Sequence, residues 1–172
     1  RDRQFQAILP LRGKVLNVAN STKTKIQDNQ QISDLIQALG CGSGDLFNDN
    51  DLRYEKIIIM TDADVDGAHI ASLLITFFHE EMPEIIDNGR LFLAVPPLYK
   101  ISQGKKIFYA KDDDDRDKII KNELNGEKKI EINRFKGLGE MMPAQLKETT
   151  MPPGNRTLLR IINPENKKND SK

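Results

Sequence analysis

The sequence predicts an α/β protein, with a mostly parallel sheet flanked by helices and a small α+β segment after it. The branched apolar run at residues 57–61 is typical of a buried strand. From Ala68 onward apolar residues recur at helical spacing, and a second apolar run at 91–95 stops at two prolines. Strand, helix and strand in this order indicate a βαβ unit with parallel strands and a right-handed crossover.

Before this unit, apolar and polar stretches alternate. Residues 5–18 hold two short apolar stretches around a turn at Gly13, and the polar residues 20–31 predict a loop. A short amphipathic helix is expected next, ending at Gly40. Residues 41–55 are rich in Gly, Asn and Asp, which favours another loop. The apolar residues at helical spacing in the predicted helix are Ile32, Leu35, Ile36 and Leu39.

Beyond residue 100 the pattern predicts a second, smaller group of elements. Residues 106–110 are expected to form a strand, and an acidic run then opens a helix over 112–124. The acidic run is interpreted as helix N-terminal charge, because carboxylates there complement the helix dipole. A turn at 125–126 leads to a strand over 129–135, and a glycine-punctuated turn at 136–140 leads into a further helix.

These elements divide the 172 residues into three parts. Residues 1–100 contain the βαβ unit, and residues 101–163 form the second group. Residues 164–172 are polar, charged and poor in apolar side chains, so they are expected to be disordered. The first residue is not Met, and the sequence is therefore expected to be a segment of a longer protein.

Composition excludes several classes of protein. No run approaches the ~20 apolar residues of a membrane-spanning helix and there is no signal-peptide pattern, so no membrane association is expected. A single cysteine, Cys41, excludes an internal disulfide and favours a reducing cytoplasm. It lies between glycines with no histidine motif nearby, which argues against a catalytic thiol.

Charge is balanced overall but unevenly distributed. Residues 1–25 carry a net charge of +5, residues 26–115 one of −10, and residues 116–172 one of +5. Two basic flanks around an acidic centre can frame a polyanion over a metal site. The charge counts alone favour the simpler interpretation, an ordinary solvated surface.

The acidic turn after the first predicted strand is the main candidate for a functional site. Asp62, Asp64 and Asp66 stand at alternate positions and Gly67 follows them. Open α/β sheets bind their ligands at the carboxyl ends of the strands. Three carboxylates this close repel one another, and the usual compensation is a hard divalent cation, Mg²⁺ or Mn²⁺ first.

Three kinds of site begin with such a turn. An EF-hand loop needs a glutamate at its twelfth position, where this chain has Leu73, and a helix before it, where this chain has a strand. Phosphatases of the haloacid dehalogenase class use two aspartates after a core strand, the first as nucleophile, and the acidic run at 112–115 supports them weakly. A TOPRIM-type phosphodiester site on a Rossmann-like sheet uses aspartates to hold Mg²⁺. The turn alone does not separate the second kind from the third.

Four segments, taken together, resemble one known family. Residues 6–18 (QAILPLRGKVLNV) and 58–70 (IIMTDADVDGAHI) resemble two of its motifs, the second being its TOPRIM acidic motif. Residues 96–100 (PPLYK) and 134–141 (RFKGLGEM) match two further signatures. In this order, over residues 3–161, they are highly specific for the B subunit of bacterial type IIA DNA topoisomerases. The chain resembles the C-terminal part of that subunit, a TOPRIM domain with its tail.

The resemblance implies a function and a metal site. The family cuts both strands of DNA, passes a second duplex through the break and reseals it, using ATP bound by an N-terminal domain outside this sequence. The A subunit supplies the attacking tyrosine in an A2B2 heterotetramer. By similarity, Asp62 and Asp64 are metal ligands that serve catalysis through the metal, and Asp66 is a second-site or outer ligand. Mg²⁺ is the implied cofactor, with Mn²⁺ or Ca²⁺ as substitutes.

The resemblance also implies contacts with double-stranded DNA. Lys14 and Asn17 match the family's DNA contacts, and His69 is expected to contact DNA rather than metal. A lysine offers a point charge to phosphate, and an asparagine offers both a donor and an acceptor. The turn at 136–140 has two interpretations: a simple helix start, or backbone amides near phosphate or the A subunit.

The family's TOPRIM site also uses a glutamate from an EGDSA-type segment, and no such segment precedes Arg1. An incomplete site is therefore expected, with weak metal binding and no cleavage by this chain alone. The absent segment is expected to carry a strand, leaving one sheet edge exposed. Within the family, residues 67–72 and the short link between Tyr109 and Arg134 favour the topoisomerase IV branch over the gyrase branch.

Overall fold

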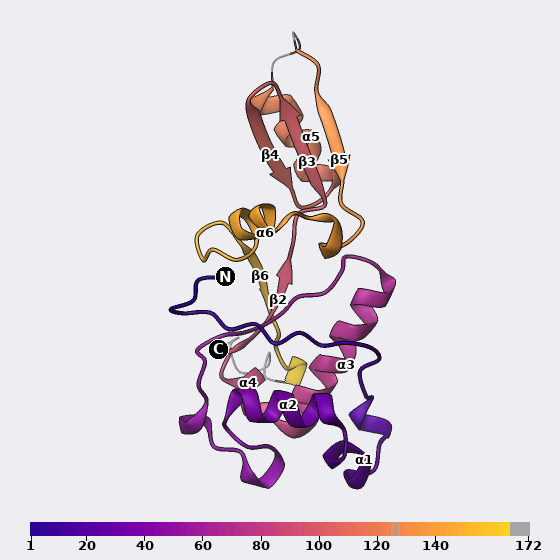
Figure 1. Cartoon of the computed structure of the whole chain (residues 1–172), viewed down its shortest axis with the longest axis vertical. Helices are drawn as coiled ribbons and strands as arrows, with labels where there is room; N and C mark the ends of the chain where they lie inside the picture. The colour runs from indigo at the N-terminus through magenta and orange to yellow at the C-terminus, as the bar shows by residue number, and fades with distance from the viewer. Residues whose placement is uncertain (125, 127, 166–172) are drawn as a thin grey trace.

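The computed structural model describes residues 1–124, 126 and 128–165. Two small sheets follow one another along the long axis of the molecule (Figure 1). The strands of the first sheet, in spatial order, are β1 (Ile57–Ile59), β2 (Leu91–Val95) and β6 (Thr157–Arg160). The strands of the second sheet are β4 (Lys106–Ala110), β3 (Tyr99–Gln103) and β5 (Glu131–Arg134).

The first sheet contains the predicted βαβ unit. Strands β1 and β2 are parallel, with Ile57 opposite Leu91, and the chain between them forms α3 (Val65–Glu81) and α4 (Pro83–Asp87). The predicted α/β class is therefore confirmed. Strand β6 lies antiparallel on the other side of β2, so this sheet is mixed and β1 is one of its edges.

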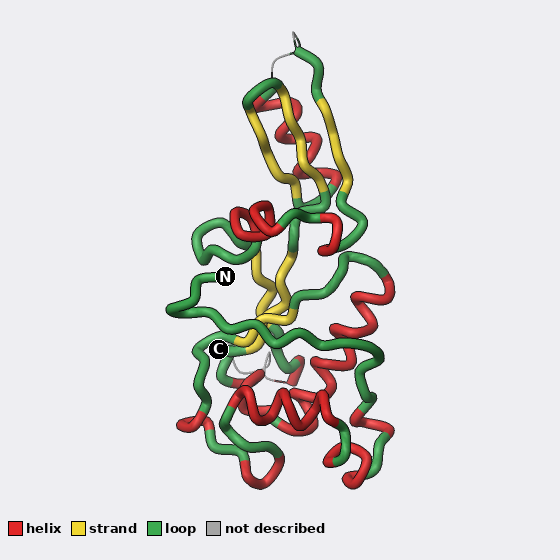
Figure 2. The backbone as a smooth tube through the Cα atoms, in the orientation of Figure 1, coloured by secondary structure: helices red, strands yellow, loops and turns green. Residues whose placement is uncertain are grey.

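The second sheet is antiparallel, and a short segment connects it to the first. Strand β3 follows β2 after Pro96 and Pro97, and β4 and β5 pair with its two sides. The chain then returns through η4 (Leu138–Glu140) and α6 (Pro143–Thr149) to β6 (Figure 2). Strand β6 thus belongs to the predicted second part in sequence and to the first sheet in space, while the proposed boundary near residue 100 stays a prediction.

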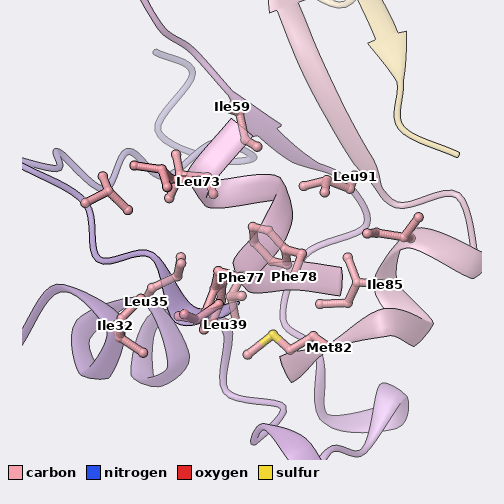
Figure 3. Packing of buried hydrophobic residues seen from close by; sticks show 14 of the residues in the cluster. Ile32, Leu35, Leu39, Ile59, Leu73, Phe77, Phe78, Met82, Ile85 and Leu91 are labelled. Atoms are coloured by element: carbon pink, nitrogen blue, oxygen red, sulfur yellow. The ribbon is translucent and has the colours of Figure 1, made fainter. Parts of the chain in front are cut away.

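The larger core surrounds α3. Its side chains Phe77 and Phe78 are fully buried and meet edge to face, with ring centroids 5.3 Å apart. Helix α2 (Gln30–Leu39) buries its apolar face beside them, and its C-terminal Gly40 adopts the left-handed conformation (φ 75°), as its position predicted. Figure 3 shows these side chains converging with those of β1, β2 and α4.

The polar stretch at residues 20–31 was predicted as a loop, and that prediction is wrong for part of it. Residues Lys23–Gln27 form α1, and the Thr22 hydroxyl oxygen accepts the Lys25 N–H at its start. No residue of α1 is buried, so the hydrophobic periodicity that reveals most helices is missing. The predicted loop at 41–55 contains only two 3₁₀ turns, η2 (Gly44–Leu46) and η3 (Asp49–Asp51).

The second sheet packs against α5 (Asp113–Glu123). The Asp112 carboxylate accepts the Asp115 N–H at 2.8 Å, so the acidic run is the helix N-terminus that the sequence predicted. The small core beneath α5 consists of Tyr99, Ile101, Ala110 and Leu124. The turn predicted at 125–126 lies partly, and the predicted disordered C-terminus mostly, outside the described residues. No helix in the described ranges is long and apolar enough to cross a membrane.

Candidate functional site

The acidic turn joins the carboxyl end of β1 to the N-terminus of α3. Ile59 is buried at the end of the strand, whereas Asp62, Asp64 and Asp66 are all exposed. The N-terminus of a helix carries partial positive charge, which favours carboxylates and other anions beside it. The structure therefore places the three predicted ligands at an edge where acidic groups are stabilised and solvent can reach them.

Asp64 has a defined structural role in the turn. It is the N-cap of α3, and its Oδ1 accepts the Gly67 N–H at 2.7 Å. This bond satisfies one of the N–H groups that a helix leaves unpaired in its first turn. A carboxylate has two oxygens and about four acceptor positions, so capping α3 does not prevent Asp64 from also binding a cation.

Gly67 lets the turn close tightly. It is buried, and a methyl group at its Cα would overlap the carbonyl oxygen of Asp62. The main chain at the end of β1 therefore packs directly on the first turn of α3. This close approach explains the glycine after the third aspartate, because no other residue leaves space for the carbonyl.

The Asp62 side chain is held from a distant part of the sequence. Its Oδ1 accepts the Leu138 N–H at 2.8 Å, although 76 positions separate the two residues. Leu138 is the first residue of η4, in the glycine-punctuated turn after β5. Ala63 of the acidic turn and Gly137 of the later turn line one small cleft together with Pro97, which lies between β2 and β3. The second part of the chain thus reaches the acidic turn through a backbone amide.

The turn that provides this amide is closed by its own hydrogen bonds. The Lys136 N–H donates to Glu140 Oε2 at 2.7 Å, and the Glu140 N–H donates to the Gly137 carbonyl at 3.1 Å. We call residues 136–140 the clamp loop. Neither sequence-based interpretation of this loop included a contact with Asp62, because a backbone N–H leaves no signature in the residue type.

The predicted metal ligands are close in sequence but only partly brought together. Within the described residues, no group of three or more His, Cys, Asp and Glu side chains is arranged to hold a metal ion. Asp62 and Asp64 each engage a backbone N–H, and Asp66 lies in the first turn of α3. Carboxylate oxygens suit Mg²⁺, which commonly takes only one or two carboxylates and keeps several waters. The donors therefore suit a hard cation and would supply only part of its coordination shell.

The predicted DNA contacts lie on two segments that pack together. Lys14 is exposed and directly precedes the buried Val15. Asn17 is half-buried. The Asn17 side-chain oxygen caps η1 (Val18–Asn20) by accepting the Ala19 N–H. The side-chain NH₂ group of Asn17 is a separate donor that can bind a ligand. Because η1 packs against α3, this segment lies beside the helix that carries the exposed His69 in its second turn.

Two family models match the chain. The model described as Toprim domain matches residues 1–96, and the model described as DNA gyrase B subunit, carboxyl terminus, matches residues 127–171. The first match covers both the acidic turn and the predicted DNA contacts. The second match begins before β5 and includes the clamp loop, so the contact between Asp62 and Leu138 joins the two matched regions.

Curated relatives match almost the whole chain. It is 64% identical over 161 residues to the B subunit of DNA topoisomerase 4 from Bartonella bacilliformis, covering 94% of this chain and 23% of that protein. It is 60% identical over 164 residues to the corresponding topoisomerase 4 protein of Caulobacter vibrioides, covering 95% and 24%. Identity to the B subunit of DNA gyrase from Thermotoga maritima is 53% over 161 residues, covering 94% and 25%. The chain spans about a quarter of the length of these relatives, and the matches confirm the resemblance that the four sequence segments predicted.

Proposed function

The chain belongs to the Toprim family, and from this premise we propose that it is the Toprim and tail part of a type II DNA topoisomerase B subunit. Toprim domains bind Mg²⁺, and here the acidic turn provides the ligands. The observation that carries the proposal is the placement of exposed carboxylates between β1 and α3, with Asp62 held in place by the clamp loop. The similarity to a topoisomerase 4 B subunit covers 94% of the chain, which argues against a phosphatase of the dehalogenase class.

Asp62 and Asp64 are the proposed Mg²⁺ ligands, and Asp66 is an outer or second-site ligand. When bound, the ion would polarise a phosphate oxygen of DNA and stabilise charge on the leaving oxygen. The residues of this chain hold and orient that ion and the phosphate. The N-terminus of α3 adds a favourable field for phosphate at the same place. A further carboxylate, such as the glutamate that the resemblance implies, would complete the shell.

Lys14, Asn17 and His69 are the proposed DNA contacts. The Lys14 ammonium suits a phosphate as a mobile point charge, and the Asn17 amide group is available to donate because its oxygen caps η1. His69 lies on α3, only five residues beyond Asp64. Support for this assignment is that η1 and α3 pack together, so that one DNA backbone can reach both segments.

The proposed enzyme assembly also needs parts other than this chain. An A subunit would supply the tyrosine that attacks DNA, in an A2B2 assembly, and ATP would bind elsewhere in the full-length protein. The proposed cellular role is decatenation and relaxation of the chromosome, which places the protein in the cytoplasm. Identities of 64% and 60% to topoisomerase 4 relatives, against 53% to a gyrase relative, favour topoisomerase IV, with gyrase as the alternative.

The test is DNA cleavage by the full-length protein with its A subunit and Mg²⁺. We expect Asp62→Asn and Asp64→Asn each to reduce cleavage by about a hundredfold or more, because the ion loses a charged ligand. Asparagine still accepts the Leu138 or Gly67 N–H, so both variants should stay folded. Asp45→Asn, an exposed aspartate of η2, is the matched control and should cleave like the wild type.

Cleavage at the wild-type level by both acidic-turn variants would refute the proposed function. A separate assay distinguishes the two branches of the family. With its A subunit and ATP, the full-length protein should relax and decatenate DNA without adding negative supercoils. Accumulation of negative supercoils would assign the chain to gyrase.

A further inference from the structure

We propose that the clamp loop is a positioning element that orients the Asp62 carboxylate for the cation, and that Gly137 is present in it to leave room for that carboxylate. The inference rests on the proposed function and names residues that neither the sequence motifs nor the similarity to relatives assigns to metal binding. It is carried by three features of the contact: the hydrogen bond, the absence of a Cβ, and the internal closure of the loop.

The hydrogen bond fixes one of the two carboxylate oxygens. The Leu138 N–H donates to Asp62 Oδ1 at 2.8 Å, so this amide engages Oδ1 and not Oδ2. Hydrogen bonds to a ligating carboxylate orient it toward the metal, and losing such a partner commonly weakens metal binding by about 10- to 100-fold. A backbone amide suits this role because it carries no charge that would compete with the cation.

Gly137 is required for space and not for its backbone conformation. Its φ of −166° and ψ of 173° are extended values that any residue adopts. A Cβ at this position would lie 3.0 Å from both Cγ and Oδ1 of Asp62 and 3.2 Å from Oδ2. These distances are shorter than van der Waals contact. Because the carboxylate ends a short, rotatable side chain, an added methyl group displaces the carboxylate and leaves the fold intact.

Glu140 holds the clamp loop in its binding conformation. Its Oε2 accepts the Lys136 N–H at 2.7 Å, and its own N–H donates to the Gly137 carbonyl at 3.1 Å. The loop is thus closed from both ends of the segment that presents the Leu138 amide. Glu140 is therefore a positioning residue that acts through this amide.

The chain offers a matched pair of substitutions in the same loop. A Cβ at Gly139 would meet no atom within 4 Å, whereas one at Gly137 would press on Asp62. In the full-length protein, Mn²⁺ binding measured by electron paramagnetic resonance should weaken about tenfold for Gly137→Ala and stay unchanged for Gly139→Ala. The Mg²⁺ concentration that gives half-maximal DNA cleavage should rise by the same factor. Thermal unfolding in EDTA should be unaffected, or shifted slightly upward, for both variants.

Glu140 provides a second, independent measurement. Glu140→Gln keeps an oxygen that accepts the Lys136 N–H, and should bind Mn²⁺ as the wild type does. Glu140→Ala opens the loop and should weaken Mn²⁺ binding about as much as Gly137→Ala does. In an Asp62→Asn background, Gly137→Ala should cause no further loss, since the displaced charge is already absent.

The outcomes separate this inference from the proposed function. If Asp62→Asn abolishes Mn²⁺ binding and cleavage while Gly137→Ala behaves like Gly139→Ala, the positioning role is wrong and the function stands. If Asp62→Asn changes neither Mn²⁺ binding nor cleavage, the proposed function itself fails. Equal loss of metal binding and of thermal stability in Gly137→Ala would show a general structural defect, and would also overturn the positioning role.

Discussion

The two sheets of the molecule are supported by cores of very different size. Among the described residues, sixteen buried side chains form the core beside the first sheet, from Val15 in the N-terminal segment to Leu91 in β2, whereas four form the core of the second. Strand β5 is exposed along its whole length. A three-stranded sheet covered by one helix is close to the smallest unit that is stable by itself. The acidic turn therefore lies beside the larger core, whereas the clamp loop follows the second sheet, which has the smaller core.

This difference separates two tasks at the site. The main chain of the acidic turn is fixed by the large core, through the buried Ile59 of β1 and the first turn of α3. The orientation of the Asp62 carboxylate depends on the clamp loop, which follows β5 of the second sheet. Changes in the two regions should therefore have different consequences: loss of the whole fold in one case, and loss of carboxylate orientation in the other.

The largest expected effect comes from truncating one core side chain in each region. Phe77→Ala removes a fully buried ring from the large core and should lower the free energy of unfolding by about 3–5 kcal/mol. Ile101→Ala in the small core should lower the stability of the second sheet and α5 by about 2–5 kcal/mol, with little effect on the larger core. Amide hydrogen exchange should accelerate throughout the chain for Phe77→Ala, but only in the second sheet and α5 for Ile101→Ala.

Hydrogen exchange also tests whether the two regions unfold independently. If Ile101→Ala accelerated exchange in β1, β2 and α3 as much as in the second sheet, the two regions would form a single cooperative unit. Exposed Leu159 on β6 is a control for each variant, since Leu159→Ala removes a side chain that is already 52% exposed. That substitution should leave exchange in both regions close to the wild-type rates.

A somewhat smaller effect is expected from adding one methyl group at the acidic turn. Gly67→Ala would bring its Cβ onto the Asp62 main chain, which cannot rotate away as a side chain can, and should cost about 3 kcal/mol. Denaturant unfolding should show this loss in the presence of EDTA. Gly139→Ala is the control and should unfold at the wild-type midpoint. A wild-type midpoint for Gly67→Ala would mean that the turn tolerates a wider geometry.

The smallest effect is a pH dependence confined to the second sheet. The pKa of Tyr99 is raised because its hydroxyl donates to the Asp113 carboxylate, with burial and the charge of Asp113 adding to the shift. The neutral phenol is thus favoured by folding, and this contribution is complete below the unfolded pKa of about 10. It is lost as the pH rises through the higher folded pKa. Exchange in β3 and α5 should accelerate there before exchange in α3 does.

Tyr99→Phe is the matched variant for this pH effect. It removes the hydroxyl and keeps the ring over which the Arg116 guanidinium lies, 5.0 Å from the ring centroid. The alkaline acceleration of exchange in the second sheet should become weaker in this variant. An unchanged alkaline profile would assign the effect to another group, such as Tyr109, whose pKa burial also raises.

Several elements followed from local patterns in the sequence, because local physics decides them. The helix ending at Gly40 needed only apolar spacing and a residue that adopts positive φ. The acidic opening of α5 was predictable since Asp112 caps its own helix. Helix α1, which has no fully buried residue, was missed because its mostly polar composition shows no periodicity. Its one local signal was Thr22, which caps the helix at its first turn.

The candidate site divides in the same way. The sequence by itself determined the acidic turn, since three aspartates and Gly67 after an apolar strand belong to one continuous segment. It did not reveal that Asp64 caps α3, because the same carboxylate suits both a cap and a metal ligand.

Only the tertiary structure decided which distant backbone meets that turn. The Leu138 amide reaches Asp62 because the chain leaves the first sheet at Pro96, builds the second sheet, and returns to pair β6 with β2. Contacts between residues so far apart in sequence depend on the path of the whole chain and on the packing of both cores. A backbone N–H and a missing Cβ carry no side-chain chemistry, so a sequence pattern alone does not indicate their partner.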